Sequence, residues 1–104
     1  MNMIKEKQAT SEHRREMREA AKLLRALANP IRLCLLEKLI EDGPTNVKGI
    51  GECMDVSQPN LSQHLKVLRD QGIVEAEKIQ NQVFYSCERE DVRKLIETLK
   101  EVGK

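Results

Sequence analysis

The sequence predicts a mainly α-helical fold with one two-stranded β-hairpin, and three observations lead to this fold class. Aliphatic residues recur at three- and four-residue steps along most of the 104-residue chain, which is the spacing of one helical face. Over residues 73–87 this period gives way to β-branched and aromatic residues around a polar Gln80-Asn81-Gln82 turn. Aromatic residues make up 2% and charged residues 34% of the chain, a composition that suits helices with aliphatic packing. The predicted order of elements is α-α-α-α-β-β-α.

The elements follow from the chain in order. Residues 1–10 read as a flexible polar N-terminal arm, and residues 11–104 as one domain. A first helix covers about residues 11–28 and is closed by Asn29-Pro30, because the residue before a proline is pushed out of the α region. A second helix then runs from Pro30 or Ile31 to about Glu41, and a last helix covers about residues 90–102.

The stretch from Asp55 to Val74 is the most informative part of the chain. Ser57 predicts an N-cap, and Pro59 falls in the first turn, where its missing N–H costs no helical bond. Gly72 predicts the end of this helix. A short helix over about residues 46–54 precedes it, joined by a link of about three residues. The pair predicts a helix-turn-helix over about residues 46–71, followed by a hairpin wing over about residues 73–87.

The helix after Ser57 has an apolar side and a polar side. Three leucines at spacings of four and three define the apolar seam, and amide, hydroxyl and cationic side chains occupy the rest. Such side chains hydrogen-bond base edges and phosphates, although the same pattern also fits a merely solvated surface. Net charge is only +1, so any DNA binding must depend on a few placed cations, helix N-termini and base contacts.

Several other function classes find no support in the sequence. No run of 18 or more apolar residues is present, and the N-terminal residues lack the apolar core of a signal peptide. We therefore expect a cytoplasmic protein that has no membrane partner and keeps its three cysteines reduced unless they sense or ligate. The chain has no Gly-rich phosphate loop, nucleophile elbow or metalloprotease helix, so we do not expect an enzyme.

Three sequence stretches follow one another in an order that is characteristic of a known family: ALANPIRLCLLEKL, then VSQPNLSQHLKVLRDQGIV, then a wing that ends in VFYSC. In this combination the chain resembles the ArsR/SmtB family of bacterial winged helix-turn-helix repressors over about residues 20–100. The resemblance implies a homodimer bound to a palindromic double-stranded DNA operator, with the helices over about 11–28 and 90–102 forming the dimer interface. Both terminal helices carry apolar stripes of their own, which either form that interface or close the monomer's core.

The resemblance also suggests which residues contact DNA. Lys66, and Lys78 in the wing, are candidate phosphate contacts, although the wing lacks the arginine-rich tip of many relatives. His64 lies beside the leucine seam and is expected to pack there rather than ligate. The candidate base contacts come from the start of the helix: Gln58, Pro59, Asn60, Ser62 and Gln63.

Members of the family usually release DNA when an inducer binds, and the standard metal sites look absent here. Asn46 and Lys48 occupy the positions of the cysteine pair of thiophilic metal sensors, and no histidine lies beyond His64 to complete a zinc-type site. No cofactor is expected to be required. A metal or metalloid inducer is therefore disfavoured without being ruled out.

The three cysteines are the remaining candidates for sensing. Cys53 and Cys87 are expected to pack in the core, whereas the helical neighbours of Cys34 are charged, which predicts partial exposure and a thiolate favoured by Lys38. Three modes of control stay open: a thiol switch through Cys34, a nonstandard thiol site for a metalloid, and regulation without a small inducer. The rival to a DNA-binding regulator is a winged-helix module that binds protein.

Overall fold

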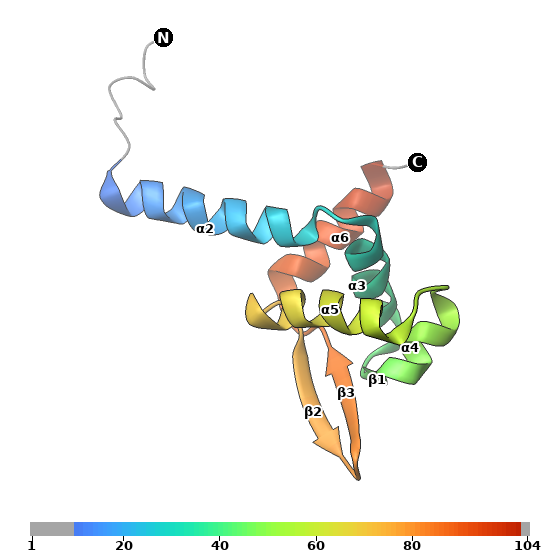
Figure 1. Ribbon diagram of the computed structural model, residues 1–104. Helices are drawn as coiled ribbons and strands as arrows, with labels where there is room; N and C mark the ends of the chain where they lie inside the picture. The colour runs from blue at the N-terminus through green and yellow to red at the C-terminus, as the bar shows by residue number, and fades with distance from the viewer. Residues whose placement is uncertain (1–9, 103–104) are drawn as a thin grey trace.

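The computed structural model describes residues 10–102, apart from the side chain of Cys53. The predicted arm, residues 1–10, therefore lies outside the described residues except for its last one. Within residues 10–102, five helices and three short strands follow one another (Figure 1): α2 (Ser11–Leu27), α3 (Pro30–Asp42), β1 (Thr45–Asn46), α4 (Val47–Cys53), α5 (Gln58–Asp70), β2 (Glu75–Ile79), β3 (Gln82–Ser86) and α6 (Glu90–Val102). The predicted mainly helical fold with a β wing is confirmed.

Local capping explains where the first two helices begin. The Thr10 side chain accepts a hydrogen bond from the backbone N–H of His13 at 3.0 Å and caps α2. Asn29 separates α2 from α3, and its Oδ1 accepts from the N–H groups of Ile31 and Arg32 at 2.9 and 3.1 Å. Pro30 occupies the first position of α3, where no N–H is needed. The Asn29-Pro30 pair thus ends one helix and starts the next.

The helix-turn-helix consists of α4 and α5. Ser57 caps α5, as predicted, by accepting from the N–H of Asn60 at 3.3 Å. Gly72 follows α5 with a φ of +71°, a left-handed conformation that glycine adopts without strain. The N–H of Gly72 donates to the carbonyl of Arg69 at 2.9 Å, which satisfies one of the free carbonyls at the end of the helix.

The wing is an antiparallel hairpin in which Ile79 pairs with Gln82. Its turn is therefore the two residues Gln80 and Asn81, both with positive φ, as in the tight turns that match strand twist. Gln82, expected in the turn, begins β3 instead. The two-residue strand β1, which the sequence did not predict, pairs with β3 and gives the sheet order β1-β3-β2.

One hydrophobic core joins these elements, with α3 at its centre (Figure 1). Ile73 and Val74 were predicted to begin the first wing strand, but they lie in the link between α5 and β2, where both are buried. The fully or almost fully buried side chains include Leu35, Leu36, Leu39, Ile50, Leu61, Leu65, Leu68 and Val92.

The two terminal helices leave much of their surface uncovered. The first ten residues of α2 are all exposed, and this part of the helix projects from the rest of the fold (Figure 1). None of the helices in the described part of the chain is both long enough and apolar enough to cross a membrane.

Candidate nucleic-acid interface and cysteine sites

The outer face of α5 carries all the residues expected to read bases. Leu61, Leu65 and Leu68 are at most 1% exposed, so they fix which side of the helix faces the core. The polar residues of the same helix are held on the outside because they fall between these leucines in the helical period. All six of the predicted contact residues in α5 are exposed: Gln58, Pro59, Asn60, Ser62, Gln63 and Lys66.

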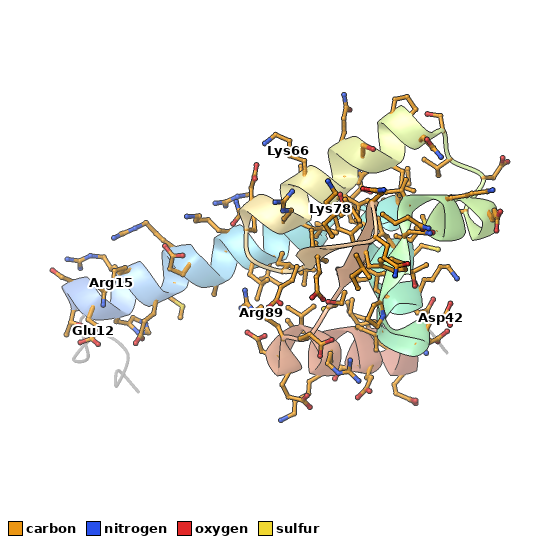
Figure 2. The ribbon with its side chains drawn as sticks, turned by 90° about the horizontal axis from the view of Figure 1, so that it is seen from below. Glu12, Arg15, Asp42, Lys66, Lys78 and Arg89 are labelled. Carbon is orange, nitrogen blue, oxygen red and sulfur yellow. The ribbon has the colours of Figure 1, made fainter. Side chains whose placement is uncertain are left out.

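From Ser57 to Arg69 the outer face of α5 carries only neutral and positively charged side chains. No carboxylate occurs in the sequence from Ser57 to Arg69, so nothing within α5 itself repels a phosphate before its last residue, Asp70. Lys66 projects outward from α5 (Figure 2), and its Nζ lies 3.0 Å from Oδ2 of Asp70. The Lys66 side chain is 75% exposed in this pair. Exposed pairs of this kind contribute little, so a phosphate can replace Asp70 as the partner at small cost.

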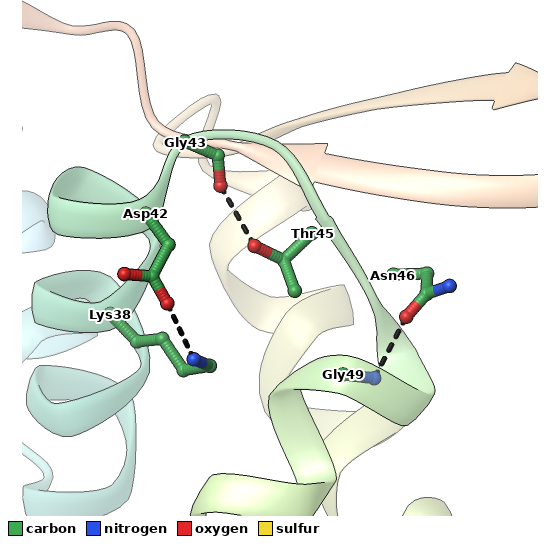
Figure 3. A network of polar contacts seen from close by, with 6 residues as sticks. All are labelled: Lys38, Asp42, Gly43, Thr45, Asn46 and Gly49. Atoms are coloured by element: carbon green, nitrogen blue, oxygen red, sulfur yellow. Dashed lines mark hydrogen bonds and ion pairs between the residues drawn. The ribbon is translucent and has the colours of Figure 1, made fainter.

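Asn46 links the wing to the helix-turn-helix. Its Oδ1 caps α4 by accepting from the N–H of Gly49 at 2.8 Å (Figure 3). Its Nδ2 donates to Oε1 of Gln82 at the start of β3, at 2.5 Å. Asn46 also pairs with Phe84 in the sheet. The sequence reasoning missed this role, because Gln82 lies 36 residues after Asn46 along the chain. Lys78, the predicted wing contact, is exposed on β2.

The loop that leads into β1 is fixed by further short-range contacts. The Thr45 hydroxyl donates to the carbonyl of Gly43 at 2.8 Å, and Lys38 Nζ lies 2.6 Å from Oδ2 of Asp42 (Figure 3). Gly43 has a φ of +80°, which lets the chain turn sharply after α3. These contacts place Asn46 against both α4 and the wing.

His64 is half-buried beside the leucine seam, as expected. Burial lowers the pKa of its imidazole, and the nearby positive charge of Arg32 lowers that pKa further. The described residues hold no group of three or more His, Cys, Asp or Glu side chains arranged for a metal ion. His64 therefore has the environment of a packed, neutral histidine.

The two cysteine side chains that the structure describes differ sharply. Cys34 is exposed, whereas Cys87 is buried and its pKa is raised mainly by that burial, which disfavours the reactive thiolate. The side chain of Cys53 lies outside the described part of the chain. Lys38, expected to favour a Cys34 thiolate, forms an ion pair with Asp42.

Cys34 lines a cavity of about 220 Å³ between α3 and α6. The cavity is also lined by Leu33, Ile96 and Leu99, with Glu37 and Lys100 at its polar edge. Lys100 Nζ lies 3.4 Å from Oε2 of Glu37 and 3.1 Å from Oε2 of Glu41, which raises the pKa of Lys100. This ion-pair cluster joins the two helices beside the thiol.

A second, more apolar cavity lies on the outer side of the terminal helices. It has a volume of about 370 Å³, and Leu33 and Leu99 line it as well as the cavity beside Cys34. Leu24 and Leu99 are 57% and 47% exposed there, which is unusual for leucine side chains in one contiguous surface. Its remaining lining residues are Leu27, Ala28, Leu95 and Thr98.

Comparison with known proteins identifies the family to which the chain belongs. Residues 29–76 match the family model described as "Bacterial regulatory protein, arsR family". The "Biofilm growth-associated repressor" of Agrobacterium fabrum is 41% identical over 81 residues, which cover 78% of this chain and 68% of that protein. The chain belongs to the arsR family of bacterial regulatory proteins. It is therefore a DNA-binding transcriptional regulator and not an enzyme.

Solved structures agree with this assignment to the arsR family. The crystal structure of NolR from Sinorhizobium fredii matches with a TM-score of 0.81 at 33% identity, covering 89% of this chain and 92% of that chain. The homodimeric winged helix-turn-helix DNA-binding domain of Mb0332 from Mycobacterium bovis, described as a possible ArsR-family regulator, matches with a TM-score of 0.81 at 26% identity. That match covers 90% of this chain and 86% of the other.

Proposed function

We propose that this arsR-family chain is a homodimeric repressor that binds a palindromic operator through α5. The observation that carries the proposal is the outer face of α5, where exposed amide and hydroxyl groups stand without a carboxylate from Ser57 to Arg69. Gln58, Asn60 and Gln63 supply donor and acceptor pairs for base edges in the major groove. Lys66 and Lys78 contact phosphates and set the register.

The dimer is supported by the uncovered apolar surface of α2 and α6. Met17, Leu24, Leu99 and Val102 are 51%, 57%, 47% and 74% exposed in the single chain. A second copy of the chain covers them, and the homodimeric relative from Mycobacterium bovis has the same fold. Two α5 helices of such a dimer enter successive major grooves about 34 Å apart.

The experiment measures binding of the purified protein to DNA from its own promoter region. We expect binding at least tenfold tighter than to a scrambled duplex of the same length, at a stated salt concentration. The double substitution Gln63→Ala/Lys66→Ala should remove most of this preference. Lys94→Ala on the exposed side of α6 is the matched control. If the double variant keeps the preference of the wild type, α5 does not read the operator.

A promoter assay then decides the direction of control: repression gives higher transcription in the absence of the protein.

We further propose that release from the operator involves Cys34. The support is its exposure, together with its position in a cavity that shares Leu33 and Leu99 with the outer apolar surface. A group added to the Cys34 sulfur disturbs the packing of α3 against α6 and hence the proposed dimer. With a peroxide, the thiolate sulfur takes one oxygen and becomes a sulfenic acid, and the other oxygen leaves as hydroxide.

The test treats the operator complex with peroxide, polysulfide, arsenite or zinc. Release by peroxide or polysulfide that Cys34→Ser abolishes and Cys87→Ser preserves supports the thiol switch. Release by arsenite or zinc alone supports a nonstandard metal or metalloid site instead. A complex that resists all four treatments shows control without a small thiol-reactive or metal inducer.

A further inference from the structure

A basic cavity lies between α2, α3 and α5, away from the predicted contact residues. It has a volume of about 330 Å³ and is lined by Lys22, Arg25, Ala26, Arg32, Val67 and Gln71. These residues supply three cationic side chains and one amide, and no carboxylate belongs to the described lining. We call this site the basic pocket.

The cations of the basic pocket are only weakly neutralised. Lys22 Nζ lies 3.8 Å from Oε2 of Glu19, but both side chains are about half exposed or more, so the pair is weak. Arg25 is exposed on the last turn of α2.

Arg32 differs from the other two cations of the pocket because part of its guanidinium group is buried. Its Nε is buried, yet it has no hydrogen-bond partner among the described residues. Leaving a buried donor of a charged group unpaired is costly, and native proteins do it rarely. The charge of Arg32 also acts on His64 of α5, whose pKa it lowers. Arg32 therefore brings a positive charge to the lining of the pocket, and its buried Nε has no acceptor among the described residues.

A neighbouring cavity shows that unneutralised positive charge is not a general property of the surface cavities. It shares Gln71 with the basic pocket, but its other polar lining is Glu19, Arg89 and Asp91. Arg89 already donates to both carboxylate oxygens of Asp91, at 3.1 and 2.7 Å. Asp91 thus already occupies one side of the Arg89 guanidinium, and the carboxylates of Glu19 and Asp91 disfavour an anion in this cavity.

We propose that the basic pocket binds a phosphate group through Lys22, Arg25, Arg32 and Gln71. The guanidinium of arginine presents parallel N–H donors that match two phosphate oxygens, and lysine and the Gln71 amide add further donors. A phosphate in the pocket neutralises the cluster, which a water molecule does not, and a small shift of the Arg32 side chain toward it gives the Nε–H an acceptor.

The operator backbone is the first source of such a phosphate, and this step rests on the proposed function. Asn60, Val67 and Gln71 follow one another at spacings of seven and four along one flank of α5. At 1.5 Å per residue the pocket lies roughly 10–16 Å along the helix from Asn60. The major groove is about 12 Å wide, so a helix that reads bases with Asn60 brings the pocket near the phosphates at the groove edge.

The proposed dimer leaves the basic pocket open. Lys22 is five residues from Met17, which places it about 140° around the α2 axis from the exposed apolar stripe. The second source, a free phosphate-bearing molecule, can therefore also reach the pocket. The chemistry is the same, and the experiment separates the two sources.

The experiment uses the full chain with Lys22→Gln/Arg25→Gln, which changes two exposed positions of α2. Arg18→Gln, at another exposed position of the same helix, is the control. One arm measures operator affinity as a function of salt. The other titrates the protein without DNA with pyrophosphate and follows the Arg32 Nε–H signal by NMR. Thermal unfolding verifies that all variants are folded.

Loss of a backbone contact predicts at least a fivefold drop in operator affinity at about 0.15 M salt, with a salt slope shallower by about 1. This result, absent in Arg18→Gln, assigns the phosphate to DNA. The other outcome is that the double variant keeps the operator affinity of the wild type but loses the shift of the Arg32 signal with pyrophosphate, while Arg18→Gln keeps that shift. This outcome assigns the phosphate to a free compound. If neither the drop in operator affinity nor the pyrophosphate shift is observed, the proposal is overturned. If the wild type does not bind its promoter, the proposed function fails, and the pyrophosphate arm alone decides the pocket.

Discussion

The outer face of α5 and the outer surface of α2 and α6 come from helices with the same apolar spacing but end in opposite environments. In α5 the three leucines of the seam are at most 1% exposed, and only polar groups face outward. In α2 and α6 the stripe is split: Leu27 and Ile96 are buried, whereas Leu24 and Leu99 remain about half exposed. The period of a helix thus tells which residues share a side, but the fold of one chain does not cover every such side.

The largest effect should come from a substitution in the buried leucine seam of α5. Leu68→Ala removes a fully buried side chain and leaves a cavity, so the free energy of unfolding should fall by roughly 2–5 kcal/mol. Chemical denaturation measures this at a fixed protein concentration. Leu24→Ala, which removes the same atoms from a half-exposed site, should cost the single chain far less. Equal losses under conditions that keep the chain monomeric would show that Leu24 belongs to the monomer's own core.

The second prediction concerns the uncovered side. Leu99→Glu places a charge where two apolar surfaces meet in the proposed dimer, and the twofold symmetry repeats the change. Full burial of a leucine contributes about 1.5–3 kcal/mol, and about half of that is available at Leu99, which is 47% exposed in the single chain. Two lost sites therefore raise the dimer dissociation constant by about tenfold to a hundredfold. Sedimentation measures the dissociation constant, and Lys94→Glu on the exposed side of α6 is the control. A variant that stays dimeric would place the interface elsewhere.

Much of the fold was predictable because its signals are local. The Ser57 cap, the Asn29-Pro30 boundary and the three leucines of α5 lie within a few residues of the structure that they determine. The strand β1 could not be predicted, since two residues are too few for a period and its partner β3 is far along the chain. The link from Asn46 to Gln82 and the unpaired Nε of Arg32 likewise depend on how distant elements pack.

The candidate site divides in the same way. The exposed face of α5 follows from the helical period, and the exposure of Cys34 follows from its charged neighbours on α3. The roles of Gln58 and the other contact residues in reading DNA stay predictions, as do the domain boundaries. The pairing of Lys38 with Asp42 was not expected, because this helix was predicted to end at about Glu41, one residue before Asp42.

A smaller effect should come from the residue that joins the helix-turn-helix to the wing. Asn46→Ala removes both the cap of α4 and the hydrogen bond to Gln82, and the lost cap alone should cost about 1 kcal/mol of unfolding free energy. Gln82→Ala removes only the link, so it should preserve most of the stability. Both variants should weaken operator binding if the link positions the wing. Normal binding by Gln82→Ala would show that the wing is held in place by β1 pairing alone.

The smallest effect concerns His64, on the border between the seam and the outer face of α5. Its pKa in the folded protein is lowered from 6.5 by burial and by Arg32, so the unfolded chain takes up a proton first as the pH falls. Stability contributed by neutral His64 is therefore complete above pH 6.5 and declines as the pH falls from there toward the folded pKa. His64→Gln should flatten this part of the stability profile, measured by denaturation between neutral and mildly acidic pH. His13→Gln, at the exposed start of α2, should leave the decline in place. Stability that instead rises on acidification in the wild type, and not in His64→Gln, would mean that the imidazole has an acidic partner and that Arg32 points away from it.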